Sequence, residues 1–186
     1  MLAYVFWHWR QSPSGSEEYE ARQRAFHAAL AAEPPAGFHR STTCSLSGAP
    51  WAAGGEAAYE DWYLVDGMSS LEALNQAAVT GSRQRAHDSA AALAAGGAAG
   101  LYGLRAGVPL DAPTHAAWFG KPAGMRYPEL FEELTPLLLQ TDAALWMRQM
   151  VLGPTPEFCL HGAVPAVLPP RYAPLQLRLR PVWPAR

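Results

Sequence analysis

The sequence has one lysine, few charged residues and no cationic stripe. Of its 14 basic residues only Lys121 is a lysine, and the arginines are scattered along the chain. Charged residues make up 16% of the chain, and the net charge at pH 7 is −2. Because nucleic-acid binding needs a concentrated positive surface, we expect no nucleic-acid partner.

Cysteines and long apolar runs are also scarce. Cys44 and Cys159 stand far apart without CxxC spacing, which favours two buried, reduced thiols over a disulfide framework. No stretch approaches the roughly 18 apolar residues that suggest a membrane helix. The N-terminal MLAYVFWHWR lacks the basic start and cleavage site of a signal peptide. We therefore expect a cytoplasmic protein with no membrane partner.

Diagnostic motifs of catalysis are missing as well. The sequence has no P-loop, no GxGxxG after a predicted strand and no GxSxG. Its 6 histidines show neither HxH nor HExxH spacing. We predict no metal site, and the sequence leaves the cofactor unknown.

A strand, a turn and a helix between Tyr59 and Leu93 organise the first half of the chain. Strand formers fill residues 2–10, 38–46, 58–66 and 101–105, whereas capped helical patterns cover 16–32 and 69–95, with Gly81 interrupting the second. The element order β-α-β-β-α-β over residues 1–106 predicts a ferredoxin-like half.

Residues 107–186 repeat part of this order. Strands are predicted at 115–119, 143–152, 157–160 and 175–182, and a helix at 126–139 with Pro136 kinking it. A proline-rich segment replaces the second helix. We therefore expect an α+β protein with two ferredoxin-like halves, the second degenerate, whose antiparallel sheets form an α+β barrel.

The run YLVDGMSSLEALNQAAVTGSRQRAHDSAAAL resembles the third strand and second helix of the dimeric α+β barrel superfamily. That group includes antibiotic-biosynthesis monooxygenases and EthD-like, YciI-like and haem-degrading proteins. The resemblance implies paired ferredoxin-like sheets and a small-molecule site. In the haem-degrading branch a histidine of this helix binds iron, together with a tryptophan ten residues upstream and an asparagine on the first strand. Here His87 matches, but Ala77 replaces the tryptophan and the first strand has no asparagine, so we do not expect haem degradation.

His87 and His8 are the candidate catalytic residues, because imidazole titrates near neutral pH. A continuous helix from Ser70 would turn His87 towards solvent, whereas a break at Gly81 would let it join a buried face. Alternation places His8 with Leu2, Tyr4 and Phe6 on one face of the first strand, opposite Val5, Trp7 and Trp9. Packing or surface histidines are the alternatives for both.

Two arginines and three tryptophans are candidate ligand-binding residues. Arg40 and Arg148 each follow an aromatic residue by two positions in the two halves, and could together hold a carboxylate or phosphate. Ion pairs at the sheet edge are the alternative. Trp7, Trp62 and Trp146 lie in predicted strands, as core residues or as the lining of a flat apolar pocket.

Three functions remain open from the sequence. The first is a barrel protein that binds a hydrophobic or aromatic small molecule, as a cofactor-free monooxygenase-like enzyme. The second is a non-catalytic structural protein whose barrel is filled by its own side chains. The third is a protein-interaction module that uses the sheet edges or residues 163–174. A thinly covered sheet face in the second half would favour a homodimer.

Overall fold

A computed structural model of the chain describes residues 1–11, 15–52, 58–150 and 153–184. In chain order its elements are β1 (Leu2–Arg10), α1 (Ser16–Ala32), β2 (Phe38–Leu46), β3 (Ala58–Val65), α2 (Ser69–Ala78), α3 (Gly81–Ala91), β4 (Ala94–Ala106), β5 (His115–Phe119), α4 (Tyr127–Thr141), β6 (Ala144–Arg148), β7 (Phe158–Gly162), η1 (Pro170–Tyr172), β8 (Leu175–Arg178) and β9 (Arg180–Trp183). The predicted α+β class is confirmed. The described helices include none long and apolar enough to cross a membrane.

One antiparallel sheet of nine strands frames the molecule, in the order β8-β5-β7-β6-β4-β1-β3-β2-β9. Its two edge strands are β8, which pairs with β5, and β9, which pairs with β2; only Leu179 separates them in sequence. Among the described residues no ladder joins β8 to β9, so the sheet is not closed. The expected barrel closure is wrong, and so is the single last strand at 175–182, since the chain changes partner at Leu179.

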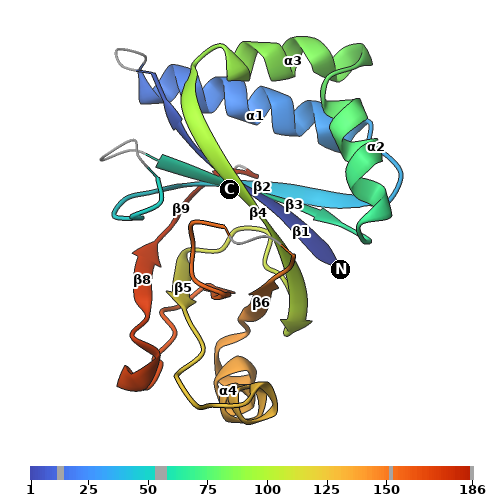
Figure 1. Ribbon diagram of the computed structural model, residues 1–186. Coiled ribbons are helices and arrows are strands. Elements are labelled where there is room, and N and C mark those ends of the chain that lie inside the picture. Colours follow the sequence, from blue (N-terminus) through green and yellow to red (C-terminus); the bar gives the residue numbers. More distant parts are fainter. Residues whose placement is uncertain (12–14, 53–57, 151–152, 185–186) are drawn as a thin grey trace.

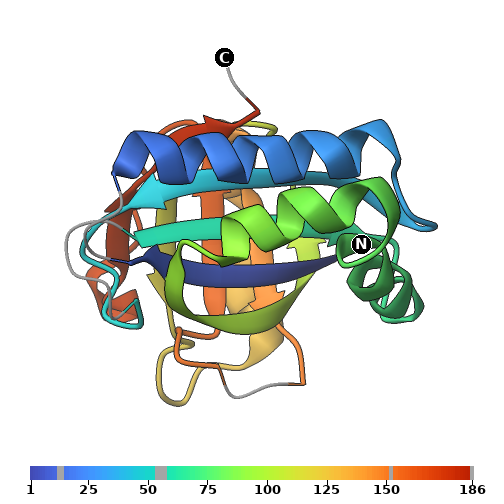
Figure 2. The same cartoon turned by 90° about the horizontal axis from the view of Figure 1, so that it is seen from above.

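The two halves of the chain contribute their strands in the same relative order. The first half gives β4-β1-β3-β2 and the second gives β8-β5-β7-β6, and the halves meet where β4 pairs with β6. Helices α1 and α3 lie side by side over the face of β1–β4 that we call the outer face, with α2 at one end (Figures 1 and 2). Helix α4 packs on the second half of the sheet.

The opposite, inner face carries the main core. Strand alternation sends Val5 and Trp7 of β1 and Trp62 of β3 to this face, where they pack with Trp118 of β5 and Trp146 of β6. These four indole side chains are at most 2% exposed. Because each buries a large apolar area, the inner face is held together by hydrophobic packing between the two halves of the sheet.

Strand β4 is much longer than the predicted segment 101–105. The run GGAAG, which lies between the predicted helix 69–95 and that strand, belongs to β4, and α3 ends at Ala91 rather than near residue 95. Glycine fits here because a Cβ on Gly97 would lie 2.5 Å from the Phe6 ring, and one on Gly96 would lie 2.8 Å from the Trp9 indole. Close approach of aromatic rings, rather than flexibility, explains these glycines.

Three other boundaries differ from the predictions. Helix α4 continues through Pro136 to Thr141, because the buried Leu130, Leu134 and Leu138 on one face outweigh the hydrogen bond that proline removes. Strand β6 ends at Arg148, whose backbone N–H donates to the carbonyl of Glu157 across a turn, so the predicted strand 143–152 is too long. Its last two residues lie outside the described ranges. Strand β7 covers 158–162 instead of 157–160.

Candidate functional site

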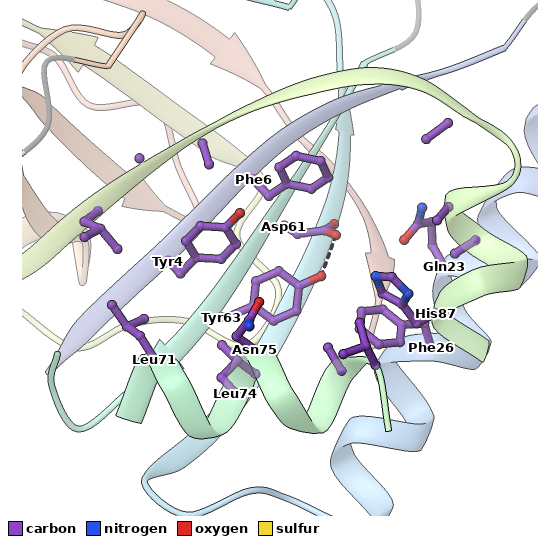
Figure 3. Close-up of a pocket in the computed structure, with 18 of the residues that line it drawn as sticks. Tyr4, Phe6, Gln23, Phe26, Asp61, Tyr63, Leu71, Leu74, Asn75 and His87 are labelled. Atoms are coloured by element: carbon purple, nitrogen blue, oxygen red, sulfur yellow. Dashed lines mark hydrogen bonds between the residues drawn. The ribbon is translucent and has the colours of Figure 1, made fainter. Parts of the chain in front are cut away.

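A pocket of about 640 Å³ lies between the outer face of β1, β3 and β4 and the three helices of the first half. Its walls are mostly apolar, with the Phe6 and Phe26 rings and the leucines of α2 facing the space (Figure 3). Asp61 is the one carboxylate among the residues that line it. The volume falls in the range of small-molecule sites, roughly 300–1,000 Å³.

Strand pairing brings the polar end of this pocket together. β1 and β3 are antiparallel neighbours with His8 opposite Tyr59 and Phe6 opposite Asp61. Alternation sends His8, Asp61 and Tyr63 to the outer face, and the intervening Glu60 and Trp62 of β3 to the inner face. The side chains of His8 and Asp61 are 1% and 3% exposed, so their interactions take place away from bulk water.

Three side chains contact the Asp61 carboxylate. The Tyr63 hydroxyl donates to Oδ2 at 2.9 Å (Figure 3). Nε2 of His27 lies 3.3 Å from Oδ2, and Nε2 of His8 lies 3.2 Å from Oδ1. The His8 contact lacks hydrogen-bond geometry, so Asp61 Oδ1 has no hydrogen-bond partner among the described residues.

His8 links Asp61 to a pocket tyrosine. Its Nδ1 lies 2.6 Å from the hydroxyl of Tyr19, a buried residue of α1 that lines the pocket. We assign the ring hydrogen of His8 to Nε2, which lies beside the carboxylate, so that Nδ1 accepts the hydrogen bond from Tyr19. The result is a chain Asp61–His8–Tyr19 that ends in the pocket. The Tyr59 ring stacks on the imidazole at 5.5 Å and fixes its orientation.

Burial and charge act on these groups in opposite directions. Burial alone would raise the pKa of Asp61, but the His8 and His27 imidazoles beside the carboxylate outweigh it and hold the pKa well below its usual range. Burial, followed by the Asp61 charge, raises the pKa of Tyr19 and of Tyr63 well above the usual 10. Asp61 is therefore an anion, and both tyrosines keep their protons at neutral pH.

His27 is a second buried imidazole at this carboxylate. It is fully buried, with Nδ1 2.7 Å from Ser41 Oγ and Nε2 2.5 Å from Thr43 Oγ1, both on β2. These hydroxyls fix the ring against Asp61 from the side away from the pocket. His27 does not line the pocket, so it positions the carboxylate rather than contacting a ligand.

His87 lines the pocket near Phe26, whose ring it meets edge-on at 5.5 Å (Figure 3). Of the two predicted alternatives, the helix break is confirmed, because α2 ends at Ala78 and α3 begins at Gly81 with a φ of +61°. The imidazole is one-third exposed and its Nδ1 lies 3.1 Å from Asp88 Oδ1. No contact joins it to the Asp61 group in the described structure.

The predicted ligand-binding tryptophans lie on the other side of the sheet. Trp7, Trp62 and Trp146 belong to the inner core and line neither of the described pockets. Trp7 and Trp62 donate their indole N–H to the fully buried Glu60, at 3.4 and 3.1 Å, and His161 lies 3.0 Å from the same carboxylate. Close packing fills this face.

The two arginines predicted to share a ligand are not brought together. Arg40 is on β2 and Arg148 on β6, with three strands between them. Arg40 contacts Asp111 at 3.0 Å and the Pro109 carbonyl at 2.5 Å. Arg148 donates to the Thr155 carbonyl at 2.6 Å. Arg40 thus holds the segment that follows β4, in the second half of the chain, whereas Arg148 holds a segment of its own half.

The Asp61 group was not foreseen from the sequence, apart from His8. The missed residues are Tyr19, His27, Asp61 and Tyr63. One signal was present: Tyr19, Gln23, His27 and Leu30 share a helical face, and polar residues on a buried face need partners. The register that brings Asp61 to them is a tertiary property. Among the described residues, no group of three or more histidine, cysteine or carboxylate side chains has the geometry to hold a metal ion.

Comparison with known proteins finds a similar fold and no sequence relative. A solved structure described as an anthrone oxidase-like protein aligns with a TM-score of 0.51 and 10% identity, covering 98% of this chain and 93% of that one. No protein-family model and no curated protein matches the sequence. At this identity the likeness shows a shared fold.

Proposed function

We propose that this protein binds a hydrophobic or aromatic small molecule in the outer-face pocket and oxidises it with O₂ without a cofactor. The observation that carries the proposal is Asp61 Oδ1, a buried anionic oxygen without a hydrogen-bond partner at the polar end of an apolar pocket. Leaving such an atom unpaired costs about 1–3 kcal/mol or more. A ligand that offers a hydroxyl or an acidic C–H there recovers this free energy.

The chain Asp61–His8–Tyr19 supplies a base in this pocket. As the Tyr19 oxygen takes a proton from the ligand, its own proton passes over the 2.6 Å contact to His8 Nδ1. Asp61 stays ionised because of its low pKa and stabilises the imidazolium at 3.2 Å. Tyr19 never needs to exist as a free phenolate, which its raised pKa disfavours. Positioned general bases contribute about 100- to 10,000-fold to a rate.

The reaction that fits a base without a cofactor is oxygenation of a carbon acid. Proton loss from an activated CH₂ group leaves a carbanion that transfers electrons to O₂. One oxygen atom remains on the carbon as a carbonyl and the other leaves as water: R₂CH₂ + O₂ → R₂C=O + H₂O. The carbanion and O₂ form a C–O bond, and the resulting peroxide takes the first proton back from His8 through Tyr19. Loss of the second C–H proton then breaks the O–O bond, and the departing hydroxide takes that proton to become water, so the substrate supplies all the electrons. The apolar walls keep water away from the carbanion.

The fold and the name of its neighbour support this choice. The solved structure of similar fold is called anthrone oxidase-like, which makes anthrone, a tricyclic ketone with an acidic CH₂ group, the first probe. The repeated strand order of the two halves supports the interpretation as a duplicated ferredoxin-like unit. We propose that two copies associate, as in the family the sequence resembles, and native mass spectrometry measures this directly.

The test is O₂ consumption with anthrone by the wild-type protein and Tyr19→Phe. The variant keeps the ring and loses the hydroxyl that ends the relay, so we expect about a 100-fold fall in kcat or more with little change in ligand affinity. Tyr127→Phe is the matched control, because its hydroxyl donates to Glu157 on the exposed surface of the second half. Equal rates in the wild type and Tyr19→Phe, above the rate without protein, would refute the relay.

His87 has a separate proposed role at the pocket wall. Its imidazole is turned towards Asp88 and Phe26 rather than towards the relay. We assign it to ligand contact, so His87→Ala should raise KM more than it lowers kcat. A loss of kcat at unchanged KM would instead return it to the catalytic role predicted from the sequence.

A second candidate function is a non-catalytic protein with a filled core. The four buried tryptophans of the inner face favour it, because they occupy the space in which a ligand of a barrel would bind. Under this alternative anthrone produces no O₂ consumption above background. Ala78→Phe places a bulky ring in the outer pocket, and Ala31→Phe on the exposed end of α1 is its control. Under this alternative both variants bind the probe like the wild type.

A further inference from the structure

A second concavity of about 740 Å³ lies on the outer face, at the residues where β8 passes into β9. It is bordered by the ends of β2 and β5 and by the start of α1. Its lining differs in kind from that of the aromatic pocket: it contains two arginines, a histidine and several hydroxyl groups, with Glu20 as its one carboxylate. Such a lining is suited to an anion.

Glu20 does not neutralise this groove. Its carboxylate is paired with the Arg180 guanidinium through both oxygens, accepts the Tyr59 hydroxyl at 3.2 Å, and has Arg24 at 3.7 Å. The Glu20 side chain is 9% exposed, whereas that of Arg180 is 61% exposed. The remaining N–H groups of Arg180 therefore stay available on the groove side.

Arg178 adds an unbalanced positive charge. It lies two residues before Arg180, so the two backbones are about 7 Å apart along the extended chain, and both side chains point to the outer face while Leu177 and Leu179 enter the inner core. In the described part of the chain Arg178 forms no ion pair. Two neighbouring guanidinium groups, of which only that of Arg180 is paired with the Glu20 carboxylate, favour the binding of another anion.

His115 and the hydroxyl groups line the rest of the groove. His115 lies opposite Arg178 in the β5–β8 ladder. The Thr114 hydroxyl donates to the Ala163 carbonyl and therefore accepts from His115 Nδ1–H at 3.0 Å, so Nε2 of the neutral ring is an acceptor, which suits the P–OH group of a phosphate rather than its charged oxygens. Ser45 of β2 lies in register with Arg180 and lines the same groove. All these side chains are held on strands or at their ends.

We propose that this groove is a binding site for a small oxyanion, a phosphate or a carboxylate, with Arg178 as its principal ligand and Arg180 and Ser45 as supporting donors. The site is separate from the aromatic pocket and independent of the proposed oxidation. The Tyr59 ring lies between the two, since its hydroxyl contacts Glu20 in the groove and its face stacks on His8.

The experiment is a titration with inorganic phosphate, followed by two-dimensional NMR or calorimetry, at constant ionic strength with chloride as the replaced ion. Saturable binding by the wild type is expected. Arg178→Gln should weaken it roughly 10- to 100-fold, the loss of one charge-assisted interaction. Arg85→Gln, an exposed arginine on α3, is the matched control and should bind like the wild type.

Acetate in a parallel titration distinguishes the two sources of oxyanion: binding of both ions indicates a general oxyanion site, and binding of phosphate alone indicates a phosphate site. Arg178→Lys, which keeps the charge without the planar fork, should bind with intermediate affinity. Tyr19→Phe should bind phosphate normally, which separates this site from the oxidation. Absence of saturable binding by either ion, or equal affinity in the wild type and Arg178→Gln, overturns the proposal.

Discussion

Replacing Asp61 by asparagine should lower the free energy of unfolding by about 3 kcal/mol, the lower end of the cost of breaking a buried ion pair. The carboxylate is 3% exposed, with two imidazoles within 3.3 Å and the Tyr63 hydroxyl at 2.9 Å. Asparagine has a similar size but offers one acceptor oxygen and adds an NH₂ group facing other donors. In a chain of 186 residues, 3 kcal/mol corresponds to a fall in Tm of roughly 6–12 °C.

The control for this variant is Asp88→Asn. Asp88 also lies 3.1 Å from an imidazole, that of His87, but its side chain is 62% exposed. Solvent screens such a pair, so its removal should leave Tm unchanged within error. Thermal and denaturant unfolding measure both variants. Equal stabilities of Asp61→Asn and Asp88→Asn would refute the assignment of Asp61 as a buried anion.

The same carboxylate fixes the sign of a pH dependence. Its pKa in the folded protein is far below the value of about 3.9 for an unfolded chain. The stabilisation is therefore complete above the unfolded pKa and is lost as the pH falls towards the folded pKa. The stability difference between wild type and Asp61→Asn should be about 1 kcal/mol smaller at pH 3 than at pH 7. A difference that grows with acidity contradicts this assignment.

Three further predictions concern residues outside the pocket. Glu60→Ala leaves two indole N–H groups and His161 unpaired in the core and should cost about 3–5 kcal/mol in denaturant unfolding, with Glu60→Gln costing less. Gly97→Ala places a Cβ 2.5 Å from the Phe6 ring, so Tm should fall by an amount that corresponds to about 1–3 kcal/mol; an unchanged Tm contradicts this crowding. Burial raises the pKa of Cys159, so its thiol should react with a disulfide reagent only on unfolding, and fast labelling of the native protein would disprove its burial.

The features that the sequence could predict follow from local rules, chiefly from the alternation of side chains along a strand. Side chains on a strand alternate between the two faces of a sheet. The sequences of β1 and β3 alone therefore place His8 on the other face from Trp7, and Asp61 on the other face from Trp62. The break at Gly81 was visible because glycine ends a helical pattern and tolerates a positive φ. Local rules of this kind need no knowledge of the partner strand.

What the sequence could not provide was register and partner. Asp61 lies beside His8 because of the register in which β1 pairs with β3, and beside His27 because α1 packs over this part of the sheet. A shift of two residues would preserve every alternation and separate the carboxylate from both imidazoles. The prediction for the glycine and alanine run of β4 was wrong for a related reason, since the conformation of this run depends on aromatic rings of the neighbouring strand β1.

Two adjacent carboxylates explain why we assign the chemistry to the outer face. Glu60 and Asp61 are both buried and both contact histidine, yet they face opposite sides of β3. Indole rings surround Glu60, and its oxygens accept from tryptophans and His161, so no atom of it remains for a ligand. Asp61 retains an unpaired oxygen at a pocket whose floor strand, β4, is built from small residues. The tryptophans that close the inner face thereby leave the outer pocket beneath α2 and α3 as the place for the ligand that we propose.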